Sequence, residues 1–200
     1  MSYSKYDYKI LFEDYNNLEE IKVEGISFSN VSIWLFARKR AYAKYREKFA
    51  PERLEEGEQW KTDFSDFLHF RCNQSWSTLY RSGLEALSEP EQLRELIVYL
   101  QDESISIEKR VKEGLQGNRH CQGVGKNILT GLLHTFKPDL YGVWNNRTED
   151  ALKKIGQMPI ITGNAGRDYI AINSALIKLA AELKTDLTTI DGFMWYISKD

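Results

Sequence analysis

A chain of 200 residues, 42% of them hydrophobic, is long enough to bury one sizeable core, and its length does not require a second domain. We therefore expect a single domain over residues 1–200. The formal net charge of -2 excludes a protein that is basic over its whole surface, so any face that binds nucleic acid must be local.

Residue spacing bears on compartment and cofactors. The two cysteines, Cys72 and Cys121, lie far apart and outside any Cys-x-x-Cys spacing, so neither a disulfide framework nor a structural metal site is indicated. The histidines show no metal-binding spacing, and no segment approaches the roughly 20 apolar residues that cross a bilayer. We therefore expect a cytoplasmic protein with no metal, no cofactor and no membrane segment.

The first part of the chain is predicted to be mainly helical. A brief alternation of apolar residues at 8–12 is the main strand signal. Apolar residues then recur at helical spacing over 29–49, and further helices are expected at about 58–72 and 76–87.

Capping residues set the helices that follow. Ser88-Glu89-Pro90-Glu91 supplies an N-cap, an early proline and a glutamate three residues after the cap, which predicts a helix to about Asp102. Gly117 is expected to close a helix that Ser106 caps, and Lys137-Pro138 to stop a later one. The expected later helices are 106–115, 126–136, 146–156, 168–183 and 188–198. The sequence therefore predicts an all-α fold.

The helix expected at 29–49 carries a cluster of basic side chains. Its members are Arg38, Lys39, Arg40, Lys44, Arg46 and Lys48. Such a cluster can follow the phosphates of nucleic acid, or it can form the solvated face of an amphipathic helix. Both interpretations stay open.

Two glycines flank one apolar residue in Gln122-Gly123-Val124-Gly125-Lys126, directly before an apolar helix. Glycine permits a tight turn whose N–H groups point outward, and the N-terminus of the next helix adds a positive partial charge. A plain turn between helices also uses glycine. We expect this turn to hold a phosphate, with Lys126 beside it.

The stretch around this turn resembles the hairpin and catalytic segment of the helix-hairpin-helix DNA glycosylase superfamily, the endonuclease III and adenine glycosylase group. That pattern runs Gly-Val-Gly, a residue that is lysine in bifunctional members, a helix, and an aspartate opening another helix that ends in Leu-Gly. Here Asn127 stands at the lysine position and Asn145 at the aspartate position, 18 residues on. Ile155-Gly156 stands at the end, so the resemblance covers about residues 115–157.

The resemblance implies an all-α, helix-hairpin-helix glycosylase-like fold, with two helical lobes around a DNA-binding cleft and the N- and C-terminal helices packed into one lobe. It implies DNA contacts from the turn and from the starts of the two following helices. These candidates are Gly123, Val124, Gly125, Lys126, Asn127 and Arg147. Trp144 and Trp76 are candidates for stacking on an extruded base, although tryptophan more often packs in a core.

Asn145 is the main departure from the family's pattern. An amide cannot supply the negative charge that the aspartate provides or accept a proton from water as a carboxylate does. Asp150 and Asp139 could replace that carboxylate, so the candidate catalytic residues are Asn145, Asp150 and Asp139. If Asn146 is the N-cap, Glu149 reaches back to its backbone N–H. In the alternative interpretation both asparagines are structural, because asparagine is a good N-cap.

The expected activity is that of a monofunctional DNA glycosylase, because Asn127 has no amine for a Schiff base. Such an enzyme flips out a modified base and hydrolyses its N-glycosidic bond, which leaves an abasic site. Residues 132–145 are also similar to a divergent bacterial branch found beside restriction-type and other antiphage proteins. That branch implies a hypermodified phage base in double-stranded DNA, such as glucosylated 5-hydroxymethylcytosine.

Two alternatives stay open: a catalytically inactive reader of modified DNA, and a helical module that binds a protein partner. A steep fall of DNA affinity with salt would separate the glycosylase and the reader, which both bind DNA, from the protein-binding module.

Overall fold

The computed structural model describes residues 7–23, 26–72 and 78–199, and most of them lie in helices. The first part of the chain forms α1 (Asp7–Asn16), α2 (Val31–Lys48), α3 (Pro51–Glu55), α4 (Gln59–Cys72) and α5 (Thr78–Glu85). After a 3-10 turn, η1 (Ala86–Ser88), come α6 (Pro90–Gln101), α7 (Ile107–Gln116), α8 (Lys126–Phe136), α9 (Asn146–Lys154), α10 (Ala165–Glu182) and α11 (Leu187–Lys199). The prediction of a mainly α-helical protein is confirmed for the described residues.

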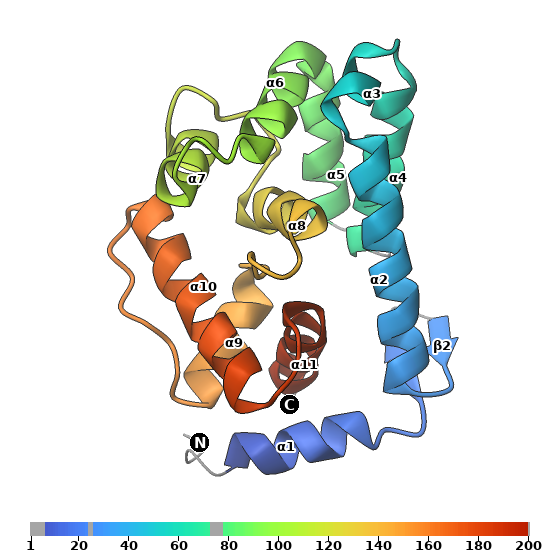
Figure 1. Ribbon diagram of the computed structural model, residues 1–200, viewed down its shortest axis with the longest axis vertical. Helices are drawn as coiled ribbons and strands as arrows, with labels where there is room; N and C mark the ends of the chain where they lie inside the picture. Colours follow the sequence, from blue (N-terminus) through green and yellow to red (C-terminus); the bar gives the residue numbers. More distant parts are fainter. Residues whose placement is uncertain (1–6, 24–25, 73–77, 200) are drawn as a thin grey trace.

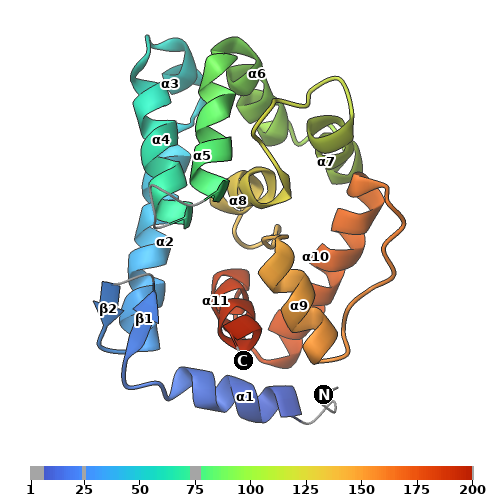
Figure 2. The same ribbon diagram turned by 180° about the vertical axis from the view of Figure 1, so that it is seen from behind.

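Helix α8 lies at the centre of the arrangement (Figure 1). Every residue from Ile128 to Phe136 is buried, because α8 packs against α2, α4, α6 and α7. Helices α4, α5 and α6 lie on one side of α8, whereas α9, α10 and α11 lie on the other, as the reverse view also shows (Figure 2). The segment after α8 therefore leads the chain to the group that begins with α9.

The strand signal at 8–12 was wrong, because these residues lie inside α1. Tyr8 and Tyr15 are fully buried, and this seven-residue spacing brings side chains to one face of a helix. On that face Phe12 packs edge-on against Phe193, with ring centroids 5.0 Å apart, and Tyr15 lies 5.6 Å from Tyr196. Helix α1 thus packs on α11, as expected for helices from the two ends of the chain.

The strands of the described residues lie elsewhere. β1 (Ile21–Val23) and β2 (Ile26–Phe28) pair antiparallel, with Ile21 opposite Phe28. These short strands and the five-residue helix α3 were not predicted from the sequence.

Two predicted helix starts need correction. The capping box at the start of α6 does not form, because Ser88 belongs to η1 and its hydroxyl donates to Glu85 O at 2.6 Å. Helix α10 begins three residues earlier than predicted, with Asn164 as its N-cap. The carboxylate of Asp168 instead accepts bonds from the preceding loop, including one from Thr162 N at 2.7 Å.

Candidate functional site

The glycine turn between α7 and α8 is tightly packed at its first glycine. Gly123 has a φ of 84°, a backbone conformation that disfavours other residues. A Cβ built at this position would overlap the carbonyl oxygen of Ser82 and lie 3.0 Å from Ala86 N. Val124 is buried beside it, which anchors the turn. Glycine at 123 is therefore required both by the backbone angle and by the closeness of α5.

Gly125 differs from Gly123 because its surroundings are open. It is the N-cap of α8, with a φ of -88°, and as a glycine it has no side chain to bond the N–H groups of the first turn. A Cβ built on Gly125 meets nothing within 4 Å. The N-terminus of an 11-residue helix is thus approachable from outside at this point, which suits an anionic group.

A polar cluster joins the first turn of α8 to the first turn of α9. Trp144 Nε1 donates to Glu149 Oε1 at 2.7 Å, and the Lys126 ammonium bonds the same oxygen. Lys126 Nζ also lies over the Trp144 ring, 5.2 Å from its centroid. The Lys126 ammonium is therefore paired with the Glu149 carboxylate, although 31% of the lysine side chain stays exposed.

The segment between α8 and α9 is fixed by bonds to its backbone. Trp144 N donates to Thr130 Oγ1 at 2.9 Å, and the buried His134 places Nδ1 2.7 Å from Tyr141 O. The Tyr169 hydroxyl donates a hydrogen bond to Gly142 O at 3.0 Å. These contacts determine where Asn145, at the end of the segment, is held.

Of the two asparagines considered as caps, Asn145 is the N-cap of α9 and Asn146 is not. Asn145 Oδ1 accepts from Thr148 N at 2.9 Å and from Thr148 Oγ1 at 3.2 Å. Asn146 is the first helical residue, so Glu149 is not its capping-box partner and bonds Lys126 and Trp144 instead. The extended backbone of Asn145 aims its amide oxygen at the first turn, so α9 begins at Asn146, as expected.

The remaining predicted site residues are more scattered. Asp139 and Asp150 are exposed, and Asp150 lies 3.8 Å from Lys153 on the same helix. Arg147 is exposed in the first turn of α9, and Asn127 is half-buried in the first turn of α8. Neither exposed aspartate is held against Asn145 by a bond among the described residues.

Of the two tryptophans that are candidates for stacking on a base, the structure describes only Trp144. Trp144 is 6% exposed, and its ring lies 6.5 Å from that of Tyr169, so in this conformation it packs in the interior. Trp76 lies outside the described residues.

The basic cluster of α2 is mostly engaged within the protein. The internal partners are Asp191 for Arg38, Asp186 for Lys39, Asp63 for Lys48 and the Thr135 carbonyl for Arg46. Arg40 and Lys44 are exposed, and each lies over an aromatic ring of its own helix. The cluster therefore mainly ties α2 to its neighbours, and Arg40 and Lys44 are its best candidates for phosphate contacts.

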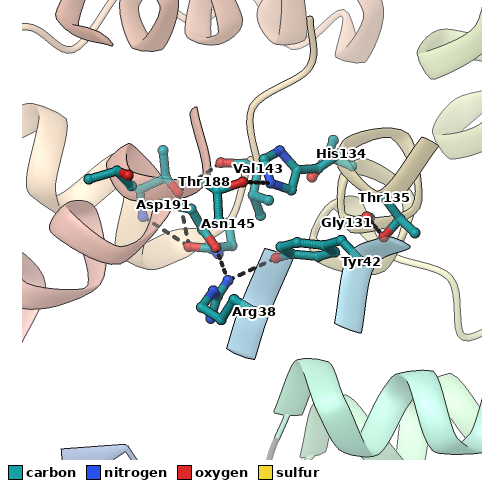
Figure 3. Close-up of polar contacts among 12 residues, drawn as sticks. Arg38, Tyr42, Gly131, His134, Thr135, Val143, Asn145, Thr188 and Asp191 are labelled. Carbon is teal, nitrogen blue, oxygen red and sulfur yellow. Dashed lines mark hydrogen bonds and ion pairs between the residues drawn. The ribbon is translucent and has the colours of Figure 1, made fainter. Parts of the chain in front are cut away.

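Sequence analysis missed a buried ion pair between α2 and α11 (Figure 3). Arg38 bonds Asp191 and donates to Tyr42 OH at 2.8 Å, and their pairing leaves only 17% and 10% of the Arg38 and Asp191 side chains exposed. Burial alone would lower the pKa of Arg38, but the Tyr42 hydroxyl and Asp191 outweigh that effect and raise it. The available signal was Asp191 itself, an acid between apolar residues in the last helix.

Two polar groups beside this pair are buried and have no hydrogen-bond partner within the described ranges: Arg38 Nε and Tyr15 OH. Burial raises the pKa of Tyr15, against the opposing charge of Arg38. A Cβ on Gly192 would lie 2.9 Å from a ring carbon of Trp34, so aromatic side chains crowd the backbone next to Asp191.

We expect the Glu149 cluster to lose its contribution to stability in acid. Burial alone would raise the pKa of Glu149, but the bonds from Lys126 and Trp144 outweigh it, so the pKa is lowered. A lowered folded-state pKa adds stability above the unfolded pKa, and this is lost as the pH falls through the folded pKa. Denaturant unfolding between about pH 6 and about pH 3 should therefore show a weaker pH dependence for Glu149→Gln than for wild type.

Asp150→Asn is the matched control, because Asp150 is the next residue of the same helix and is exposed. It should keep the wild-type pH dependence. Equal dependence in wild type and Glu149→Gln would show that the cluster does not hold an ionised carboxylate.

Comparisons with known proteins give no identification: no family model matches the chain, and no curated protein or solved structure matches it significantly. Within residues 7–23, 26–72 and 78–199, no helix combines the length and apolar character needed to span a membrane. Across the same ranges, no group of three or more histidine, cysteine, aspartate or glutamate side chains is placed to hold a metal ion.

Proposed function

We propose that this protein is a helix-hairpin-helix DNA glycosylase of the monofunctional type. The observation that carries the proposal is the turn before α8. Gly123 is required by its backbone angle and by the packing around it. Gly125 faces open space at the N-terminus of α8, where it has no side chain to cap the helix. This division of roles suits a turn that must be rigid on one side and receive a DNA phosphate on the other.

The register of the next helix supports the same proposal. Asn145, at the family's aspartate position, is the N-cap of α9, and Lys126 and Glu149 join this helix start to the hairpin. A phosphate bound at Gly125 would therefore be positioned relative to Asn145. Asn127 offers no amine and the Lys126 ammonium is bonded by Glu149, so we propose hydrolysis without a Schiff-base intermediate.

The substrate that we propose is a hypermodified base of phage DNA, such as glucosylated 5-hydroxymethylcytosine in a duplex. Enzymes that act on a base must first take it out of the stack. In this conformation Trp144 is buried, so the proposal requires that the segment before α9 move or that another group receive the base.

One observation favours a second candidate, a catalytically inactive reader of modified DNA. The Asn145 amide oxygen is already used as a helix cap, bonded twice by Thr148. An asparagine that only caps α9 needs no role in bond cleavage.

Base release separates the two candidates. Purified protein is incubated with phage DNA containing unmodified, hydroxymethylated or glucosylated cytosine, and abasic sites are measured by alkaline cleavage together with mass spectrometry of the released base. The glycosylase proposal expects abasic sites, without lyase cleavage, on one modified DNA. Salt-sensitive binding without release from any of them would favour the reader.

A further inference from the structure

The glycosylase proposal leaves a chemical need that Asn145 cannot meet. Hydrolysis of an N-glycosidic bond develops positive charge on the sugar and requires acceptance of a proton from water. A carboxylate serves both purposes, whereas an amide serves neither by ionising. Asp139 and Asp150 are exposed, and the bonds from Lys126 and Trp144 hold Glu149 at the hairpin.

Asp191 is a buried carboxylate on the helix that packs against α9. One turn earlier on α11, Thr188 Oγ1 lies 3.1 Å from His134 Nε2, and His134 Nδ1 lies 2.7 Å from Tyr141 O. The side of α11 that carries Thr188 is thus bonded, through His134, to the segment that ends in Asn145. Figure 3 draws Asp191 pointing to Arg38, with Asn145, His134 and Thr188 in the same view.

The surroundings of Asp191 are unusual for a purely structural ion pair. A buried ion pair is weak evidence for stability, because desolvation of two charges offsets their attraction. Here Arg38 Nε and the Tyr15 hydroxyl are also buried without partners within the described residues. The site therefore combines a buried carboxylate with two buried donors that have no partner in the part of the chain that the structure describes.

We propose that Asp191 supplies the carboxylate that Asn145 lacks, an inference that rests on the proposed glycosylase function. Arg38 keeps the carboxylate oriented. In the reaction the oxygen of a water molecule bonds to C1′ of the sugar, and the bond from C1′ to the base nitrogen breaks. The electron pair of that bond leaves with the base, which takes a proton from solvent, and Asp191 accepts the proton lost by the attacking water.

The test is single-turnover base release by Asp191→Asn on the DNA that wild type cleaves, with DNA affinity measured in parallel. The expected result is a release rate lower by about 100-fold or more, with unchanged affinity. Asp191→Glu should restore part of the rate, because it returns the carboxylate.

Asp63→Asn is the matched control. Asp63 is likewise a buried acid paired with a cation of α2, Lys48, and 8% of its side chain is exposed. This variant should lose stability in the same way but keep its rate of base release. If Asp191→Asn does not fold, the neutral pair Arg38→Gln/Asp191→Asn replaces it, and circular dichroism checks the fold of each variant.

Each outcome has a distinct meaning. A folded Asp191→Asn that releases base as fast as Asp63→Asn would overturn the role of Asp191 and leave the glycosylase proposal standing. Absence of release by wild type from every modified DNA would overturn both.

Discussion

Gly123→Ala is expected to lower the free energy of unfolding by about 2–4 kcal/mol, because two penalties act at one position. The alanine must adopt a φ of 84°, and its Cβ must displace the Ser82 carbonyl on α5. The displaced atom belongs to the backbone, so the strain cannot be relieved by a side-chain rotation. Urea unfolding followed by circular dichroism measures the loss.

Gly125→Ala is the control for this prediction. Gly125 has an ordinary φ of -88° and open space where a Cβ would lie, so alanine should cost only about 0.5 kcal/mol through its poorer N-cap preference. Similar losses for the two variants would contradict the different roles assigned to the two glycines.

Arg38→Met is expected to lower the free energy of unfolding by about 3–5 kcal/mol, because it leaves the Asp191 carboxylate buried without its charge partner. Restoring neutrality with Arg38→Met/Asp191→Leu should recover much of the loss, since a buried pair can be replaced by apolar groups of similar size at little cost. Thermal and urea unfolding of both variants test this.

Lys39→Met on the same helix is the matched control. Lys39 pairs with Asp186, but 51% and 41% of the two side chains are exposed, so its loss should cost only about 0–1 kcal/mol. If Lys39→Met and Arg38→Met are equally destabilised, the burial of the Arg38 pair does not determine its contribution.

The helices could be predicted where the information is local in sequence. Ser106 caps α7, and its hydroxyl accepts from Lys109 N. The need for glycine at 123 and the helix start after Gly125 follow from the motif itself. The alternation at 8–12 misled because Tyr8 and Tyr15 are buried by tertiary contacts, such as that of Tyr15 with Tyr196 of α11, which the local pattern does not reveal.

The candidate site was predicted only in part, because its buried charges depend on tertiary contacts. Asn145 was singled out by the resemblance to the glycosylase pattern and Lys126 by the glycine motif, whereas Arg38 and Asp191 are 153 residues apart and meet only when α2 packs on α11. Arg38 was grouped with its basic neighbours because the sequence does not show which charges of one helix face inward. A capping-box role was considered for Glu149 for a similar reason: one of its real partners, Lys126, is 23 residues away.

DNA affinity as a function of salt concentration, measured for wild type and Gly125→Ala, tests most directly the claim that the hairpin binds the DNA backbone. For wild type we expect the logarithm of the affinity to fall linearly with the logarithm of the salt concentration, with a slope that corresponds to several phosphates. Gly125→Ala should weaken binding about tenfold while leaving the protein folded, because its methyl group occupies the approach to the N-terminus of α8. Absence of binding, or binding that changes with neither salt nor this substitution, would contradict the account.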